Sequence, residues 1–234
     1  ISLRKRSYQY TCKKTKKNLA SGLFKMKKNL LYLTLIFLMS CGGPAVLRDV
    51  KVNNLSIKET IYECKSGRRH VLYLSGVINE DSTAILRRML RQASTCVNEY
   101  GQKISTMVVL NSRGGYLSDG FKIAKLFTEY KIHTHIGYRN TCASSCSTAF
   151  LGGKFRTMEK KATLMVHSPY TYKSRNTIEC QSRSRADNLR RYYIARIGDE
   201  DGELLFNRTM KYCSNKNGWR LNRDAAGLFG LLSR

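Results

Sequence analysis

The chain has 234 residues, of which 42 are Lys or Arg and 16 are Asp or Glu, so its formal net charge is +26. With two prolines and 42% hydrophobic residues, it can form one sizeable core and one domain. Residues 1–40 hold ten Lys and Arg and no acid, which leaves 32 basic and 16 acidic residues in 41–234. This excess of positive charge is consistent with a solvated basic face or with binding to an anionic partner in the cell envelope. No motif interleaves aromatic residues with these charges, so a nucleic-acid partner is not expected.

The N-terminal segment predicts export. Residues 1–25 are polar and basic, and we expect translation to begin at Met26, with 1–25 not part of the protein. Residues 26–40 join two lysines to an apolar run of about ten residues, which suits a signal peptide and is too short to span a bilayer. The Leu-Met-Ser-Cys sequence ending at Cys41 resembles a bacterial lipobox, which implies lipidation of Cys41 and anchoring on the periplasmic side of the cell envelope. An ordinary signal peptide or a short tether is the alternative.

Export changes the interpretation of the cysteines. Setting aside Cys12 and Cys41, six remain: Cys64, Cys96, Cys142, Cys146, Cys180 and Cys213. An even number in an oxidising compartment predicts three disulfides among fifteen possible pairings. We expect Cys64 to pair with Cys96 and Cys180 with Cys213, while Cys142 and Cys146 are either small packing residues or a third bridge. No second pair or histidine follows at ligand spacing, so no zinc or other metal site is expected.

The apolar pattern divides the remaining chain. Residues 41–68 are expected to be a linker and an N-terminal hairpin, and residues 69–234 the domain itself. A strand is predicted at 71–74, followed by a helix with Asp81 as its N-cap. In that helix one face is apolar (Ile85, Leu86, Met89, Leu90 and Ala93), and arginines fill the other.

A second strand and helix follow with a glycine turn between them. Residues 106–110 are nearly all apolar, as in a buried parallel strand, and run into Asn-Ser-Arg-Gly-Gly-Tyr and then a helical pattern. The spacing excludes a P-loop and a dinucleotide fingerprint, which leaves an oxyanion site or a plain tight turn at Gly114 and Gly115. In the strand expected at 131–137, His133 and His135 share a face, where a packing role is favoured over half of a metal site.

Two further segments carry chemistry. The stretch from Thr141 to Gly153 begins with small hydroxyl residues and ends in Gly-Gly, which is typical of a helix start that approaches a substrate closely. A buried strand at 162–167 then ends in His167. In an open α/β sheet, ligands collect at the carboxyl ends of the strands, where we expect the glycine turn, the serines and the histidine to meet.

The order of these motifs resembles the proteolytic subunit of Clp protease, in the crotonase-like superfamily. Gly-Gly, a serine at a small-residue helix start and Met-Val-His-x-Pro, with the histidine 23 residues after Ser144, occur in that order. The chain is also similar to signal peptide peptidase A and to exported bacterial proteins with a Cys-Ala-Ser-x-Cys motif. The resemblance covers 70–169 and a tail at 226–231. It implies an α/β fold of repeated ββα units with a mainly parallel sheet.

The resemblance also implies roles for individual residues. Ser144 takes the nucleophile position, His167 the general base, and Gly114, Gly115 and Ser145 the oxyanion site. The alternative is that Ser144 and Ser145 are helix caps and that His167 is a packed histidine at the end of a strand.

Two positions depart from the family pattern. Arg113 replaces the usual Pro, and no acid precedes the final helix. Asn217 stands there instead and would orient His167, with Asp187, Asp199 and Asp201 as looser candidates.

The sequence therefore predicts an exported, lipid-anchored, ATP-independent serine peptidase that acts on peptides or envelope proteins without a cofactor. Assembly into a homo-oligomer is implied by the resemblance alone. The main alternative is a catalytically inactive Clp-like protein that serves as a binding or scaffold protein of the envelope. A third interpretation is a crotonase-like activity on thioesters. It fits less well, because export would take the protein away from coenzyme A.

Overall fold

The computed structural model describes residues 45–175, 177–214 and 216–233. Residues 1–25, the signal-type segment 26–40 and Cys41 lie outside this part, so export and lipidation remain predictions. Residues 44–234 form a compact unit of their own, and the described hydrophobic core lies inside it, between Leu55 and Leu231. No helix of the described part is both long and apolar enough to cross a membrane.

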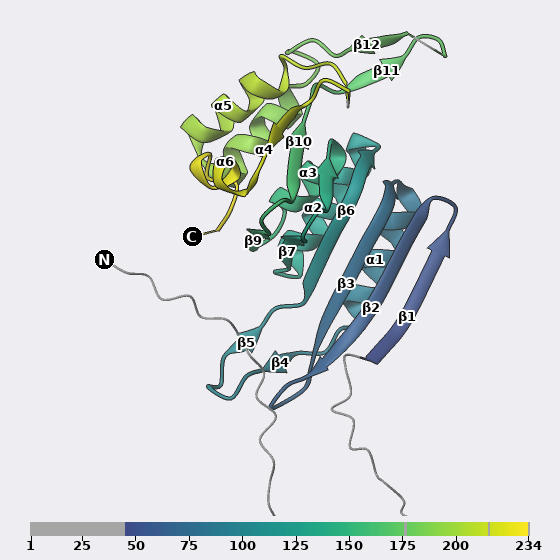
Figure 1. Ribbon diagram of the computed structural model, residues 1–234, viewed down its shortest axis with the longest axis vertical. Coiled ribbons are helices and arrows are strands. Elements are labelled where there is room, and N and C mark those ends of the chain that lie inside the picture. Colours follow the sequence, from purple (N-terminus) through teal and green to yellow (C-terminus); the bar gives the residue numbers. More distant parts are fainter. Residues whose placement is uncertain (1–44, 176, 215, 234) are drawn as a thin grey trace, which may run out of the picture. The chain divides into compact units, whose positions relative to one another are not determined.

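A nine-stranded sheet runs through the described residues (Figure 1). Its main path has the order β1-β2-β3-β6-β8-β10-β13, with β7 paired to β6 and β9 paired to β7. The inner pairs from β3 to β10 are parallel, as are the β6–β7 and β7–β9 pairs, whereas β1–β2, β2–β3 and β10–β13 are antiparallel. This mainly parallel α/β architecture confirms the predicted fold class. The strands are β1 (Ala45–Val52), β2 (Leu55–Glu63), β3 (Arg68–Ile78), β6 (Met107–Gly115), β7 (His133–Ile136), β8 (Thr141–Ala143), β9 (Phe155–Met158), β10 (Thr163–Val166) and β13 (Trp219–Leu221).

Two small hairpins and six helices complete the described fold. The hairpins pair β4 (Cys96–Val97) with β5 (Lys103–Ile104), and β11 (Tyr170–Tyr172) with β12 (Ile178–Cys180). The helices are α1 (Glu80–Arg91), α2 (Leu117–Glu129), α3 (Ser145–Leu151), α4 (Asp187–Ile197), α5 (Asp199–Thr209) and α6 (Arg223–Leu228).

The N-terminal hairpin belongs to the central sheet. Strand β2 pairs with β3 along its whole length, and Leu55 and Ile57 are buried in the core. The expected domain boundary at residue 69 therefore falls inside one sheet. The reason is that alternate residues of β2 face the core, so the strand is a structural part of the domain rather than a linker.

Helix α1 packs against β2 and β3 with its apolar face. It begins two residues earlier than expected, because Asn79 and not Asp81 is the N-cap. Asn79 has an extended backbone, its Oδ1 accepts from the Ser82 N–H at 3.0 Å, and Ser82 Oγ accepts from the Asn79 N–H at 3.0 Å. This capping box satisfies two backbone donors at once, which the exposed Asp81 does not do.

The C-terminal helices pack beside the β10 end of the sheet. Figure 1 shows α4 and α5 lying against each other, and this contact is among the most extensive between helices. After α6 the chain returns to the core through the buried Leu231, whose carbonyl accepts from Arg156 Nε at 2.9 Å. The tail therefore closes the domain by bonding to β9.

Three pairs of cysteines lie at disulfide geometry. Cys64 and Cys96 have a Cα–Cα distance of 5.7 Å, and Cys180 and Cys213 one of 5.6 Å. The third pair, Cys142 with Cys146, has a Cα–Cα distance of 5.2 Å and joins β8 to α3. The structure thus places a bridge where the sequence left a choice between packing and pairing.

Candidate active site

Ser144 occupies a sharp turn between strand β8 and helix α3. Its backbone angles are φ 58° and ψ −127°, a conformation that a residue with a side chain rarely adopts and that costs of order 1–3 kcal/mol. A strand, a strained serine and a helix in this order form the kind of elbow that presents the nucleophilic serine in α/β-hydrolases. The side chain is half-buried, whereas the neighbouring Ser145 is buried.

Covalent and hydrogen-bonded contacts hold this elbow on both sides. The Cys142–Cys146 bridge spans Ser144, and both cysteines are fully buried. The Ser144 N–H donates to the Met165 carbonyl at 2.9 Å, and Ser147 Oγ donates to the same carbonyl at 2.6 Å. These links fix the turn to strand β10, so the strained conformation is imposed by its surroundings.

Helix α4 braces α3 from the other side. The Tyr192 hydroxyl donates to the Thr148 carbonyl at 2.8 Å. Burial raises the pKa of Tyr192 above its ordinary value, so the phenol remains a donor under all physiological conditions.

His167 follows strand β10 and lies beside the serine elbow. Met165 pairs with Ala143 in the parallel register, so Ser144 and His167 leave the carboxyl ends of adjacent strands. The His167 Nδ1–H donates to the Ser168 carbonyl at 2.8 Å. Because a carbonyl only accepts, the proton of the neutral ring is on Nδ1, and Nε2 carries the lone pair.

That lone pair is buried without a partner. His167 is 6% exposed, and Nε2 has no hydrogen-bond partner within the described part of the chain; neither has Ser145 Oγ. An unpaired buried polar atom costs about 1–3 kcal/mol, and such atoms in native proteins need an explanation. The unpaired Nε2 of His167 is thus a buried acceptor whose hydrogen bond is not made within the described residues.

The glycine turn at the end of β6 touches the same elbow. Gly114 has φ +94°, and a Cβ there would lie 2.7 Å from the Ser144 Cβ and 3.1 Å from the Ser145 nitrogen. Only glycine allows this approach. The Gly114 N–H is already committed, since it donates to Ser112 Oγ at 3.0 Å. Gly114 thus allows the end of β6 and the Ser144 elbow to approach closely. Its N–H is not free for the oxyanion role that the sequence predicts.

The neighbouring Gly115 has its N–H on the other side of the strand. Its backbone is extended, and the following Tyr116 N–H donates to the Ile78 carbonyl of β3 at 2.9 Å. Donors alternate in direction along a strand, so the Gly115 N–H points away from β3 and toward the side of β8 and α3. The N–H of Ser145 lies in the first turn of α3 and, as in any first helical turn, has no acceptor within the helix.

Known structures share this arrangement of elements. No protein-family model and no curated protein matches the chain. Among solved structures, a mutant of the 1510-N membrane-bound stomatin-specific protease in complex with a substrate peptide is 16% identical, with a TM-score of 0.54 over 69% of this chain and 71% of that chain. ClpP1 from Listeria monocytogenes is 17% identical, with a TM-score of 0.50 over 69% of this chain and 88% of that chain. The chain has a Clp-like protease fold.

Within this Clp-like fold, the expected third member of the triad makes no hydrogen bond to the histidine among the described residues. Asn217 is exposed in the loop before β13, and its described hydrogen bond is a backbone one to the Ser214 carbonyl at 3.2 Å. The loop passes close to β10, because a Cβ on Gly218 would lie 3.2 Å from the Val166 carbonyl. The position that Asn217 would fill is already taken by the Ser168 carbonyl.

The looser carboxylate candidates lie elsewhere. Asp187 pairs with Arg191 at 3.2 Å on α4, and Asp199 and Asp201 stand in the first turn of α5. Arg113, which replaces the family proline, is exposed in the glycine turn. The described residues therefore supply a serine, a histidine and a backbone carbonyl as the orienting acceptor.

A second serine, histidine and acid come together on β2, β3 and the segment after α1. Ser94 Oγ is 3.0 Å from His70 Nε2, and His70 Nδ1 is 2.7 Å from Glu59 Oε1. No local sequence pattern marks this array, because the antiparallel pairing of β2 with β3 brings its residues together. Here Nε2 also accepts the Ser94 backbone N–H at 3.1 Å, and Glu59 also accepts from Arg48 Nε at 2.5 Å. The array is thus fully bonded, unlike the free Nε2 of His167, and we interpret it as structural.

Proposed function

We propose that this protein is a serine peptidase in which Ser144 is the nucleophile and His167 the general base. The observation that carries the proposal is the buried, unpartnered Nε2 of His167 at the strand end next to the strained Ser144 elbow. A serine hydroxyl is a weak nucleophile unless an acceptor of this kind removes its proton. The backbone approach of Gly114 to the same turn supports the proposal.

The reaction follows from these positions. Ser144 Oγ attacks the carbonyl carbon of the scissile amide while its proton passes to His167 Nε2, and the negative charge collects on the carbonyl oxygen. The N–H groups of Gly115 and Ser145 stabilise that charge, and in a known protease the loss of one such donor costs about 3–4 kcal/mol. The C–N bond then breaks as His167 returns the proton to the leaving amine. Water, deprotonated by the same nitrogen, hydrolyses the acyl-enzyme.

The substrate and location are part of the same proposal. We propose that the substrates are peptides or envelope proteins, that Cys41 is lipidated, and that catalysis needs neither ATP nor a cofactor. Three cysteine pairs at disulfide geometry support an oxidising compartment. Assembly into homo-oligomers, also proposed, is to be checked by analytical ultracentrifugation.

The test is covalent labelling with a fluorophosphonate probe, which reports an activated serine without knowledge of the substrate. Wild type should be labelled, and Ser144→Ala and His167→Ala should not. Ser94→Ala is the matched control, because Ser94 also lies within hydrogen-bond distance of a histidine. Its labelling should equal that of wild type, and a loss confined to Ser94→Ala would move the nucleophile to the other array.

A specific observation favours a second candidate function. Nδ1 of His167 is held by a neutral carbonyl rather than by a carboxylate, which does less to stabilise the imidazolium that forms in catalysis. The alternative is therefore a catalytically inactive Clp-like protein that serves as a binding or scaffold protein of the envelope. A folded wild type that fails to react with the probe would establish it.

A further inference from the structure

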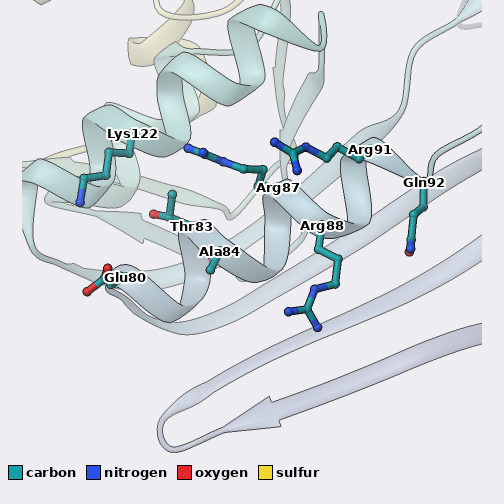
Figure 2. A pocket seen from close by; sticks show the side chains of 8 residues that line it. All are labelled: Glu80, Thr83, Ala84, Arg87, Arg88, Arg91, Gln92 and Lys122. Atoms are coloured by element: carbon teal, nitrogen blue, oxygen red, sulfur yellow. The ribbon is translucent and has the colours of Figure 1, made fainter.

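A basic hollow lies between helices α1 and α2, away from the serine and histidine. Its volume is about 660 Å³, and a smaller hollow of about 380 Å³ shares part of its lining. Figure 2 shows Arg87, Arg88 and Arg91 on α1, with Arg87 extending toward the α2 residue Lys122 and Arg88 pointing to the other side of the helix. The basic residues that line the two hollows, which we call the basic groove, are Arg87, Arg88, Arg91, Lys122 and Lys125.

Most of these charges are not neutralised within the described residues. Lys122 pairs with Asp119 at 3.0 Å, but no carboxylate of the described residues lies within 4.0 Å of the charged atoms of the three arginines or of Lys125. Glu80 and Glu129 line the hollows without pairing with them. Arg91 forms like-charge pairs at helical spacing with Arg87 and Arg88, each costing a few tenths of a kcal/mol, while the C-terminal end of α1 favours the cations of Arg88 and Arg91.

Hydrogen bonds of Arg48 connect the basic groove to β1, the first strand of the domain. Arg48 of β1 donates to Gln92, which lines the larger hollow, and also to the buried Glu59. Cys41 precedes Arg48 by seven residues, so at about 3.5 Å per residue the two Cα atoms are at most about 25 Å apart. A lipid on Cys41 would therefore keep the groove within reach of a bilayer surface.

We infer that the basic groove binds anionic phospholipid headgroups and so docks the domain on the membrane that carries its anchor. The orientation on the membrane rests on the proposed lipidation of Cys41, whereas the affinity of the groove for anionic lipid does not. Each Lys or Arg near an anionic bilayer contributes about 1 kcal/mol, and the contribution falls with salt. A groove of four unpaired cations is enough for measurable binding without any anchor.

Two other partners fit the groove less well. A second copy of this chain is itself strongly basic, with 32 basic and 16 acidic residues in 41–234, and would be repelled at most orientations. Single-stranded nucleic acid needs aromatic platforms for its bases, and Tyr130 is the one aromatic residue among those lining the two hollows. Both partners remain outcomes of the test.

The experiment uses residues 44–234, the compact unit that holds the described core and lacks Cys41. Its binding is measured by co-sedimentation with vesicles of phosphatidylcholine, with and without phosphatidylglycerol, over a series of salt concentrations. We expect binding to the anionic vesicles alone, and a decrease with salt. Arg87→Gln combined with Arg91→Gln should weaken binding by about 30-fold, from two lost contributions of about 1 kcal/mol each.

The matched control removes the same charge elsewhere. Arg185→Gln combined with Lys211→Gln changes two exposed residues outside the groove and should leave binding within about threefold. An equal loss in both variants would overturn the groove as the site. Absence of binding by a wild-type unit with a native circular dichroism spectrum would also overturn it. Release of the bound protein by single-stranded DNA, at a lower phosphate concentration than release by lipid requires, would assign the groove to nucleic acid. Self-association in sedimentation velocity that depends on the groove residues would assign it to a second copy of the chain.

Failure of this inference is separable from failure of the proposed function. Lipidation of Cys41 is read from metabolic labelling of the full chain and its Cys41→Ala variant, and peptidase activity from the fluorophosphonate probe. Neither readout depends on the basic groove.

Discussion

The imidazole of His167 donates its Nδ1–H to the backbone carbonyl of Ser168, the next residue in the chain, at 2.8 Å. This bond sets the tautomer that a general base requires, a task that a carboxylate or amide side chain performs in most triads. The tautomer therefore depends on the backbone conformation after β10 and needs no third side chain.

Asn217→Ala should leave peptidase activity within about threefold, because the side chain is exposed and the place beside Nδ1 is already occupied. His167→Ala should reduce the same rate by at least about 10⁴-fold. The measurement is the rate of fluorophosphonate labelling, followed by peptide hydrolysis once a substrate is found. A loss in Asn217→Ala as large as that in His167→Ala would show that the loop before β13 closes over the histidine in the working enzyme.

Gly114→Ala should abolish labelling of Ser144. The new Cβ would lie 2.6 Å from the Ala143 carbonyl and 2.7 Å from the Ser144 Cβ, so the nucleophile must move. Gly101→Ala is the control, since Gly101 also has a positive φ, +77°, but nothing lies within 4 Å of its Cβ position. Both changes impose about 1–2 kcal/mol of backbone strain, to which the clash adds in Gly114→Ala; urea unfolding measures these costs, and only Gly114→Ala should alter labelling. Equal labelling of the two variants would contradict the close approach.

Parts of this site could be predicted from the sequence because they follow from local pattern. An apolar run such as 106–110 predicts a buried parallel strand, and the polar or glycine residues at its end mark the edge where ligands bind. The same pattern places Ser144 at a strand-to-helix turn and His167 at a strand end. The order of these segments, through its resemblance to the Clp proteolytic subunit, predicted the fold.

Other parts depend on contacts that local pattern does not contain. The acceptor for His167 Nδ1 is a main-chain carbonyl, and every residue has one, so no residue type marks it. The Glu59, His70 and Ser94 array is assembled by the register of β2 and β3 and by the end of α1, with separations of 11 and 24 residues. Sequence analysis also assigned Gly114 a donor role that Ser112 excludes, because the partner of a backbone N–H depends on side-chain rotamers.

Removal of the Cys142–Cys146 bridge by Cys142→Ala with Cys146→Ala should reduce labelling strongly while lowering the free energy of unfolding by about 2 kcal/mol, since the closed loop is short. The bridge spans the strained Ser144, so its loss lets the elbow relax. Cys64→Ala with Cys96→Ala opens a loop with a sequence separation of 32 and should cost about 4 kcal/mol with little effect on labelling. Urea unfolding should thus show the larger loss for Cys64→Ala with Cys96→Ala, and probe labelling the larger loss for Cys142→Ala with Cys146→Ala. The same order in both measurements would mean that the Cys142–Cys146 bridge acts on stability alone.

Stability should fall as the pH is lowered from about 6.5 toward 4, in part through His133. Burial, the charge of Arg69 and the nearby His135 lower the pKa of His133 to about 4, whereas in the unfolded chain it lies near 6.5. The unfolded state therefore binds the proton first, so the contribution is fully present above pH 6.5 and is lost as the pH falls through this window. His135 has a lowered pKa as well, mainly through burial, with Glu159 acting in the opposite direction.

Because both rings are partly exposed, we expect His133 to account for only about 1 kcal/mol of the difference between pH 7 and pH 5. Urea unfolding of wild type and His133→Gln at the two pH values measures it. In the folded protein His133 Nε2 lies 2.7 Å from Thr157 Oγ1, a contact that glutamine can replace without titrating. The variant should therefore lose less stability on acidification than wild type does. An identical pH dependence in the two proteins would contradict this, because it would mean that the pKa of His133 is the same in the folded and unfolded states.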